Sequence, residues 1–143
     1  EDVDIMYLNH KFYITFEKEI VDKGNSSLNV ATIDTTQANK TTITQLLPAD
    51  CDHEPASVKT TKNGFRIYYT CDKNYPGESY SGSQIFYSDY DINWDPISID
   101  CPVETETPKG ILLYEVKDGD HGKQYFLYSQ DYLNEDNMII EEQ

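Results

Sequence analysis

Three histidines are the side chains of this sequence best suited to acid–base or metal chemistry. His53 stands between two carboxylates and His121 follows Asp120, whereas His10 has no acidic neighbour. Adjacent residues of a strand point to opposite faces, so these neighbours would not converge on one site. The sequence contains no Gly-x-Ser-x-Gly, no phosphate-binding glycine loop and no His-Glu-x-x-His. We therefore interpret the histidines as solvated surface residues and predict a protein that is not an enzyme and needs no cofactor.

Residues 89–95, Asp-Tyr-Asp-Ile-Asn-Trp-Asp, resemble the first half of a calcium-binding loop because carboxylate and amide groups alternate along them. Such a loop needs glycine where this sequence has Trp94, and a bidentate glutamate where it has Asp100. We therefore predict no metal site here. The segment is interpreted as an acidic loop that precedes a buried Trp94.

The cysteines are Cys51, Cys71 and Cys101, and their spacings do not resemble a metal-binding pair. An odd number leaves at least one thiol free or paired with another chain. The sequons Asn25-Ser26-Ser27 and Asn39-Lys40-Thr41 predict glycosylation at Asn25 and Asn39. An acidic start without a basic-then-apolar leader is compatible with a mature secreted chain and equally with a cytosolic one. Together these features predict a secreted, extracellular protein.

The net charge of −15, from 26 acidic and 11 basic side chains, opposes binding to nucleic acid or to an anionic membrane. No apolar run is long enough to span a membrane. A basic extracellular protein would instead be attracted. The 12 tyrosines suit both a shallow core and a recognition surface, because each joins an apolar ring to a polar hydroxyl.

Apolar residues alternate along much of the chain and nowhere keep a helical period for three turns, so the predicted fold is all-β, a single β-rich domain over residues 1–143. In the first strand the apolar set is Phe12, Ile14 and Phe16. A glycine-bearing loop at 118–122 between two β-rich runs predicts a hairpin. The expected strands are 5–16, a β-prone stretch at 30–47 that ends at Pro48, 65–71, 84–87, 97–99, 111–116 and 124–128, with 138–140 either a last strand or disordered.

Residues 64–71, Gly-Phe-Arg-Ile-Tyr-Tyr-Thr-Cys, match the G-x-x-(aliphatic)-x-Tyr-x-Cys strand of complement control protein (CCP, sushi) modules. Residues 71–77 resemble the C-x-x-G-Y turn of that family, with Asn74 in place of glycine. Residues 94–102, Trp-Asp-Pro-Ile-Ser-Ile-Asp-Cys-Pro, resemble its closing W…P…C segment.

The resemblance implies a degenerate sushi-like core over 51–102, with β-rich extensions at 1–50 and 103–143 that pack on it. It also implies a Cys71–Cys101 bridge. The family's third cysteine would fall near Tyr87 or Ser88, where this sequence has none, so Cys51 would lack its partner.

Divergent modules with long insertions and missing cysteines are similar to the immunomodulators that a parasitic nematode secretes. This chain is most similar to the member that blocks the interleukin-33 receptor. The resemblance implies that the protein binds and blocks a host cytokine receptor through a basic receptor surface. The alternatives are binding of the cytokine itself, a calcium-dependent adhesion or carrier domain, and a small hydrolase.

Aromatic side chains flanked by acids suit contact with a basic receptor, since tyrosine gives a large contact area at little rotamer cost. Such residues cluster between 80 and 91. The predicted contact residues are Tyr80, Phe86, Tyr87, Asp89, Tyr90 and Asp91.

Overall fold

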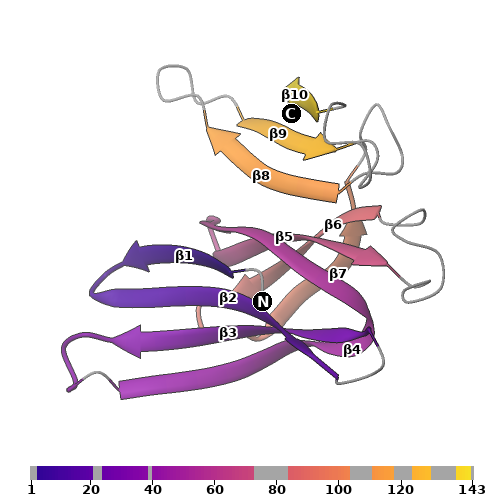
Figure 1. Ribbon diagram of the computed structural model, residues 1–143. Helices are drawn as coiled ribbons and strands as arrows, with labels where there is room; N and C mark the ends of the chain where they lie inside the picture. Colours follow the sequence, from indigo (N-terminus) through magenta and orange to yellow (C-terminus); the bar gives the residue numbers. More distant parts are fainter. Residues whose placement is uncertain are drawn as a thin grey trace.

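The computed structural model describes residues 3–20, 24–38, 40–72, 84–103, 111–117, 124–129 and 138–142. Every regular element among them is a β-strand, which confirms the all-β prediction (Figure 1). This part of the chain holds no helix that is long and apolar enough to cross a membrane. The strands are β1 (Val3–Leu8), β2 (Lys11–Glu19), β3 (Ser26–Asp34), β4 (Lys40–Thr60), β5 (Gly64–Asp72), β6 (Gln84–Asp91), β7 (Pro96–Pro102), β8 (Ile111–Lys117), β9 (Gln124–Ser129) and β10 (Met138–Glu142).

The first seven strands form one antiparallel sheet in which each strand pairs with its neighbours in sequence, in the order β1 to β7. The predicted hairpin forms as β8 and β9, and β10 pairs with β9 to make a second sheet of three strands. Strand β8 approaches β4, β5 and β6. The small sheet therefore lies on the other side of β5 from β1 and β2 (Figure 1).

Strand β4 is shared between two halves of the large sheet. Its residues from Lys40 to Cys51 pair with β3, and those from Asp52 to Thr60 pair with β5. We call β1–β3 with the start of β4 the N-terminal half-sheet, and the end of β4 with β5–β7 the C-terminal half-sheet. Residues 51–102 thus correspond closely to the C-terminal half-sheet, and β4 joins it to the preceding residues without a break.

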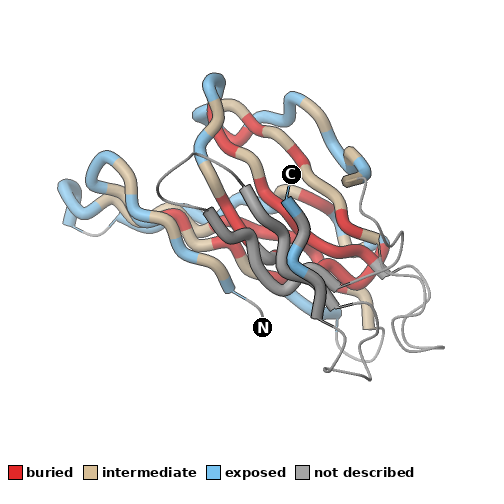
Figure 2. Tube along the Cα trace, turned by 90° about the horizontal axis from the view of Figure 1, so that it is seen from above, coloured by how far each residue is buried: buried red, intermediate tan, exposed pale blue. Residues whose placement is uncertain are grey.

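The core lies between the two half-sheets. Tyr13 on β2 packs against Phe65 on β5 and against Trp94 after β6, with ring centroids 4.8 and 5.8 Å apart. The Asp4 carboxylate on β1 also accepts a hydrogen bond of 2.7 Å from the backbone N–H of Val58 on β4. Figure 2 shows buried stretches along the central strands and exposed residues toward the hairpin tips. The core cluster consists of Tyr13, Leu28, Val30, Leu47, Val58, Phe65, Ile67, Tyr69, Tyr90 and Trp94.

The single strand predicted over 5–16 is wrong, because the chain reverses at Asn9 and His10 and forms two strands. Both residues have positive φ, 50° and 63°, and Leu8 pairs with Lys11 across them. Two central residues with positive φ define the type I′ hairpin turn, whose twist matches that of paired strands. Asparagine tolerates this conformation better than most residues do.

The strand end predicted at Pro48 is also wrong, since β4 continues past it. Proline lacks a backbone N–H and interrupts a ladder of hydrogen bonds. Here the pairing of β3 with β4 shifts register between Ser26 and Leu28, so that Leu47 and Cys51 have partners on β3 while Pro48 has none. The irregularity accommodates the proline inside one long strand.

Candidate functional site

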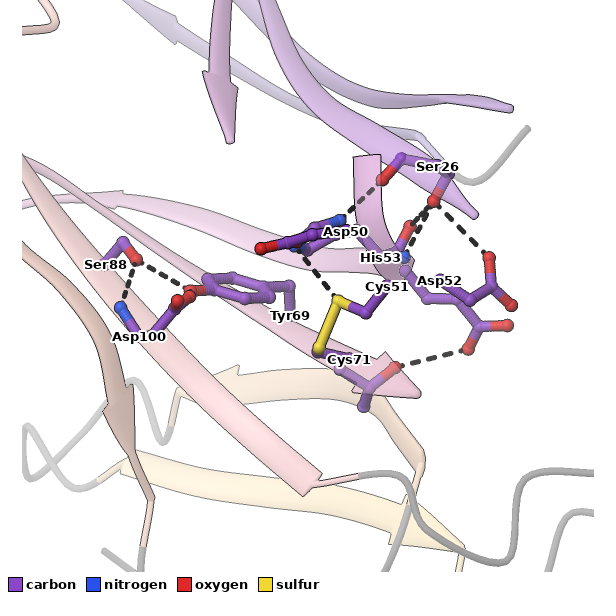
Figure 3. The surroundings of a disulfide bond; sticks show 11 residues. Ser26, Asp50, Cys51, Asp52, His53, Tyr69, Cys71, Ser88 and Asp100 are labelled. Carbon is purple, nitrogen blue, oxygen red and sulfur yellow. Dashed lines mark hydrogen bonds and ion pairs between the residues drawn. A yellow bond between two sulfur atoms is a disulfide. The ribbon is translucent and has the colours of Figure 1, made fainter. Parts of the chain in front are cut away.

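The disulfide joins Cys51 on β4 to Cys71 on β5, and both cysteines are buried (Figure 3). The predicted bridge between Cys71 and Cys101 is therefore wrong. Cys101 lies on β7, and β6 separates that strand from β5. Two strand spacings make about 10 Å, too far for a disulfide. The register also puts Cys101 beside Tyr87, on the opposite sheet face from Cys71, and its thiol is free.

His53 lies next to the disulfide and is 2% exposed. The prediction of a solvated surface histidine is therefore wrong for this residue. Its Nδ1 atom lies 2.6 Å from the carbonyl oxygen of Ser26, and its Nε2 atom lies 3.2 Å from Sγ of Cys51. A carbonyl oxygen only accepts hydrogen bonds, so in the neutral imidazole Nδ1 carries the proton and Nε2 presents a lone pair to the sulfur.

Ser26 holds this histidine from β3. Its hydroxyl accepts a hydrogen bond of 2.7 Å from the backbone N–H of His53, and it lies 3.0 Å from the His53 carbonyl oxygen and 3.4 Å from Asp52 Oδ1. These contacts fix the imidazole at the point where β4 passes from one half-sheet to the other (Figure 3). Sequence reasoning missed the cluster because Ser26 is distant in sequence and lies within a sequon.

Cys51, His53 and Cys71 are the only side chains among the described residues that converge as three metal-ligating groups, with ligand atoms within 4.8 Å of one another. In the disulfide form the sulfurs are bonded to each other. The cluster then acts as a cross-link with a buried, oriented imidazole. The carboxylates expected to form an acidic loop at 89–95 do not make such a group.

A second buried polar network lies further along the same face of the C-terminal half-sheet. The Tyr69 hydroxyl contacts Oγ of Ser88 at 2.7 Å and donates to Oδ1 of Asp100 at 2.5 Å. The backbone N–H of Asp100 donates to Oγ of Ser88 at 3.0 Å. Burial, together with the Asp100 carboxylate, raises the pKa of Tyr69. This network ties β5, β6 and β7 together.

The predicted contact residues do not form one surface. Tyr90 is 1% exposed within the core cluster, and Phe86 packs against that cluster. Tyr90 therefore cannot present its ring to a partner. Tyr87 and Asp89 lie on the opposite face of β6, because successive strand residues alternate between faces. Tyr80 lies outside the described residues.

Tyr87 and Asp89 are engaged by Arg66, their neighbour on β5. The guanidinium stands 3.8 Å from the centroid of the Tyr87 ring. It also donates two hydrogen bonds to the Asp89 carboxylate, Nε to Oδ1 at 2.7 Å and Nη2 to Oδ2 at 2.8 Å. The predicted acidic strip is therefore partly neutralised, because a bidentate pair satisfies the carboxylate.

The acidic segment after β6 forms a tight turn. Oδ1 of Asp91 accepts hydrogen bonds from the backbone N–H groups of Asn93 at 2.8 Å and Asp95 at 2.9 Å. Trp94 is buried, as predicted, and its ring stacks on Phe65 with centroids 4.4 Å apart and an interplanar angle of 9°. The turn positions this tryptophan over the core.

An apolar surface that the sequence did not suggest covers the outside of the N-terminal half-sheet. The apolar set of β2, namely Phe12, Ile14 and Phe16, points outward, whereas Tyr13, Thr15 and Glu17 point inward. Paired residues of neighbouring strands share a face, so the registers extend this set across β1, β3 and β4. We call the set the outward apolar face: Val3, Ile5, Tyr7, Phe12, Ile14, Phe16, Ile33 and Ile43.

Much of the outward apolar face is accessible. Val3 and Ile5 are each 59% exposed, Tyr7 is 55% exposed and Ile43 is 67% exposed. Tyr7 and Phe12 pair across β1 and β2 with ring centroids 4.8 Å apart. Contiguous exposed apolar side chains on a sheet mark surfaces that contact other molecules.

The remaining predicted sites lie apart from these features. Asn25 is half-buried in the loop before β3, and Asn39 lies outside the described residues. His10 is exposed in the β1–β2 turn, as expected of a surface histidine, while His121 lies outside the described residues.

Comparison with known protein families, with characterised proteins and with solved structures finds no match for this chain. The likeness to sushi modules thus rests on the sequence motifs alone and stays a prediction.

Proposed function

We propose that this protein acts outside the cell by binding another protein through the outward apolar face. The observation that carries the proposal is the exposure of Val3, Ile5 and Tyr7 on an edge strand beside Phe12. Apolar and aromatic side chains gain most when a partner removes them from water. The Cys51–Cys71 disulfide supports an extracellular location, because such cross-links persist in oxidising surroundings.

We infer that the partner is a host cytokine receptor, the interleukin-33 receptor in particular, and that binding blocks it. The likeness to secreted nematode immunomodulators supports the receptor class. The net charge of −15 supports a basic receptor surface, because opposite charges raise the rate of encounter. Blocking needs no chemistry: the protein covers the surface that the cytokine would use.

The acidic charge and the outward apolar face contribute to different steps of binding. The excess of carboxylates steers the partner over a distance, and this contribution weakens as salt screens it. The apolar side chains of β1 and β2 slow dissociation after contact, because removing them from water stabilises the complex. The Tyr7–Phe12 pair is the best candidate anchor, since aromatic residues dominate interface energetics.

The test is a binding measurement between the glycosylated protein and immobilised ectodomains of cytokine receptors, with the cytokines in parallel. Tyr7→Ala and Phe12→Ala should each weaken receptor binding at least about tenfold, the size of an interface hot spot. Ile92→Ala is the matched control, because Ile92 is 74% exposed but lies in the turn after β6. The association rate should fall as ionic strength rises.

Each outcome bears on a separate part of the proposal. Capture of a cytokine in place of its receptor would reassign the partner. A loss of binding with Tyr87→Ala but not with Tyr7→Ala would move the contact surface to β6. Absence of binding to every receptor and cytokine would overturn the function, and an association rate independent of salt would overturn the steering.

A further inference from the structure

We propose that the dithiol form of this chain binds a soft divalent cation, zinc in particular, through Cys51, Cys71 and His53. The structure holds the disulfide form, in which the three ligand atoms already lie within 4.8 Å of one another. Two thiolates and an imidazole are ligands that zinc prefers. The same three residues would then make a covalent cross-link when oxidised and a metal centre when reduced.

The histidine is oriented as a metal ligand. Its Nδ1–H donates to the Ser26 carbonyl at 2.6 Å, and this leaves the Nε2 lone pair facing the sulfurs. Zinc-ligating histidines characteristically donate their second ring N–H to a carbonyl or carboxylate, which fixes the tautomer and the ring. Ser26 Oγ also accepts a hydrogen bond from the backbone N–H of His53, so Ser26 fixes both the imidazole and the backbone of this residue.

The distances fit a tetrahedral centre after a small rearrangement. Zinc bonds of about 2.0–2.3 Å at tetrahedral angles put ligand atoms roughly 3.3–3.8 Å apart. Nε2 of His53 is already 3.2 Å from Sγ of Cys51 and 3.8 Å from Oδ1 of Asp50. The two sulfurs must separate, and each is on its own strand. Asp50, whose side chain is 65% exposed, is the candidate fourth ligand.

Burial and charge also suit a structural metal. The three side chains are 0%, 2% and 8% exposed for Cys51, His53 and Cys71. Closed sites of this kind are typical of structural zinc. Binding of one zinc ion would displace two thiol protons to solvent, and the two thiolates would balance the charge of the metal. No electrons move in this step, whereas disulfide formation gives two electrons to an oxidant, so the two states exclude each other.

The test uses the full chain with Cys101→Ser as background, so that the free thiol cannot contribute. The disulfide is first reduced with a phosphine, which takes the oxygen of one water molecule and becomes a phosphine oxide while two thiols form. The excess phosphine is then removed under an oxygen-free atmosphere. Cobalt(II) is then titrated in. We expect equimolar binding with a sulfur-to-cobalt charge-transfer band and a tetrahedral ligand-field spectrum, and displacement by zinc. The untreated disulfide form should show neither band.

His53→Gln in the same background should lower cobalt affinity at least about tenfold, since it removes one ligand. His10→Asn is the matched control and should bind like the background. If the reduced chain is unfolded, zinc must restore its strand signal in circular dichroism, because metal binding and folding are then coupled. Absent or purely octahedral cobalt binding, or equal affinity with His53→Gln, would overturn the proposal.

Discussion

Nε2 of His53 lies 3.2 Å from Sγ of Cys51, with both side chains buried where β4 leaves the N-terminal half-sheet. The histidine also contacts the ring of Tyr69 on β5, with centroids 5.7 Å apart. A single imidazole therefore touches β3, β4 and β5 at the junction of the two half-sheets.

Replacing His53 by alanine should destabilise the protein by about 1–3 kcal/mol, because the Ser26 carbonyl loses its donor while staying buried. Urea denaturation in the disulfide form measures this. His10→Asn is the control, since His10 is exposed in a turn with positive φ that asparagine adopts readily. If His53→Ala lowered the free energy of unfolding no more than the control does, the imidazole would not stabilise the junction of the two half-sheets.

Removing the disulfide with the Cys51→Ser, Cys71→Ser double variant should cost about 3 kcal/mol, because the bridge closes a loop of the unfolded chain. The two cysteines are separated by 20 positions. Cys101→Ser should change the free energy of unfolding by less than about 0.5 kcal/mol, as expected of a thiol that bridges nothing. Peptide mapping without reduction would identify the linked pair directly, and a Cys71–Cys101 peptide would contradict the structure.

Truncating Phe65 to alanine should cost about 3–5 kcal/mol, the range for a buried aromatic residue. The ring is 4% exposed and packs between Tyr13 and Trp94. Ile92→Ala is the control on the exposed turn and should stay within about 0.5 kcal/mol of the unchanged protein. Fluorescence of the single tryptophan, followed in urea, reports both values.

Two buried tyrosines should make the fold sensitive to alkaline pH. Burial raises the pKa of both Tyr69 and Tyr90 above the ordinary phenol value. Unfolded tyrosines ionise near about pH 10. The stability that these groups contribute is thus fully present below that pH and is lost as the pH rises toward the raised folded values. Denaturation curves measured across this range should show a falling midpoint.

At neutral pH, loss of the hydroxyl group should affect stability differently at Tyr69 and at Tyr90. Tyr69→Phe removes hydrogen bonds to Ser88 and Asp100 and should cost about 1–3 kcal/mol. The Tyr90 hydroxyl is buried without a hydrogen-bond partner among the described residues, so Tyr90→Phe should be neutral or slightly stabilising. Equal losses for both variants would show that ring packing, and not the hydrogen bonds, decides the effect.

Local patterns predicted the strands well where one face was clearly apolar. Alternation from Phe65 to Cys71 marked β5, and the glycine-bearing loop marked the β8–β9 hairpin. The buried Trp94 was also predicted. These features depend on neighbours in sequence, which a pattern can reveal.

The same reasoning failed where distant segments decide the outcome. Phe12 and Ile14 are more apolar than Thr15, but the inward face of β2 is fixed by the register with β3 and by Phe65 across the core. Similarly, the cysteine pairing follows from strand order, because Cys51 and Cys71 are on adjacent strands while β6 intervenes before Cys101. The position of Ser26 beside His53 depends on the same order.

The strand order of the large sheet also has a kinetic meaning. Each strand of this sheet pairs only with strands adjacent in sequence, so hairpins can form one after another as the chain leaves the ribosome. Such short-range pairing keeps the entropy of loop closure small. Within the large sheet a long-range event follows, in which Tyr13 meets Trp94 and the two half-sheets close. With the disulfide intact, that closure should be slower than hairpin formation, and residues on either side of it should control the refolding rate of the large sheet.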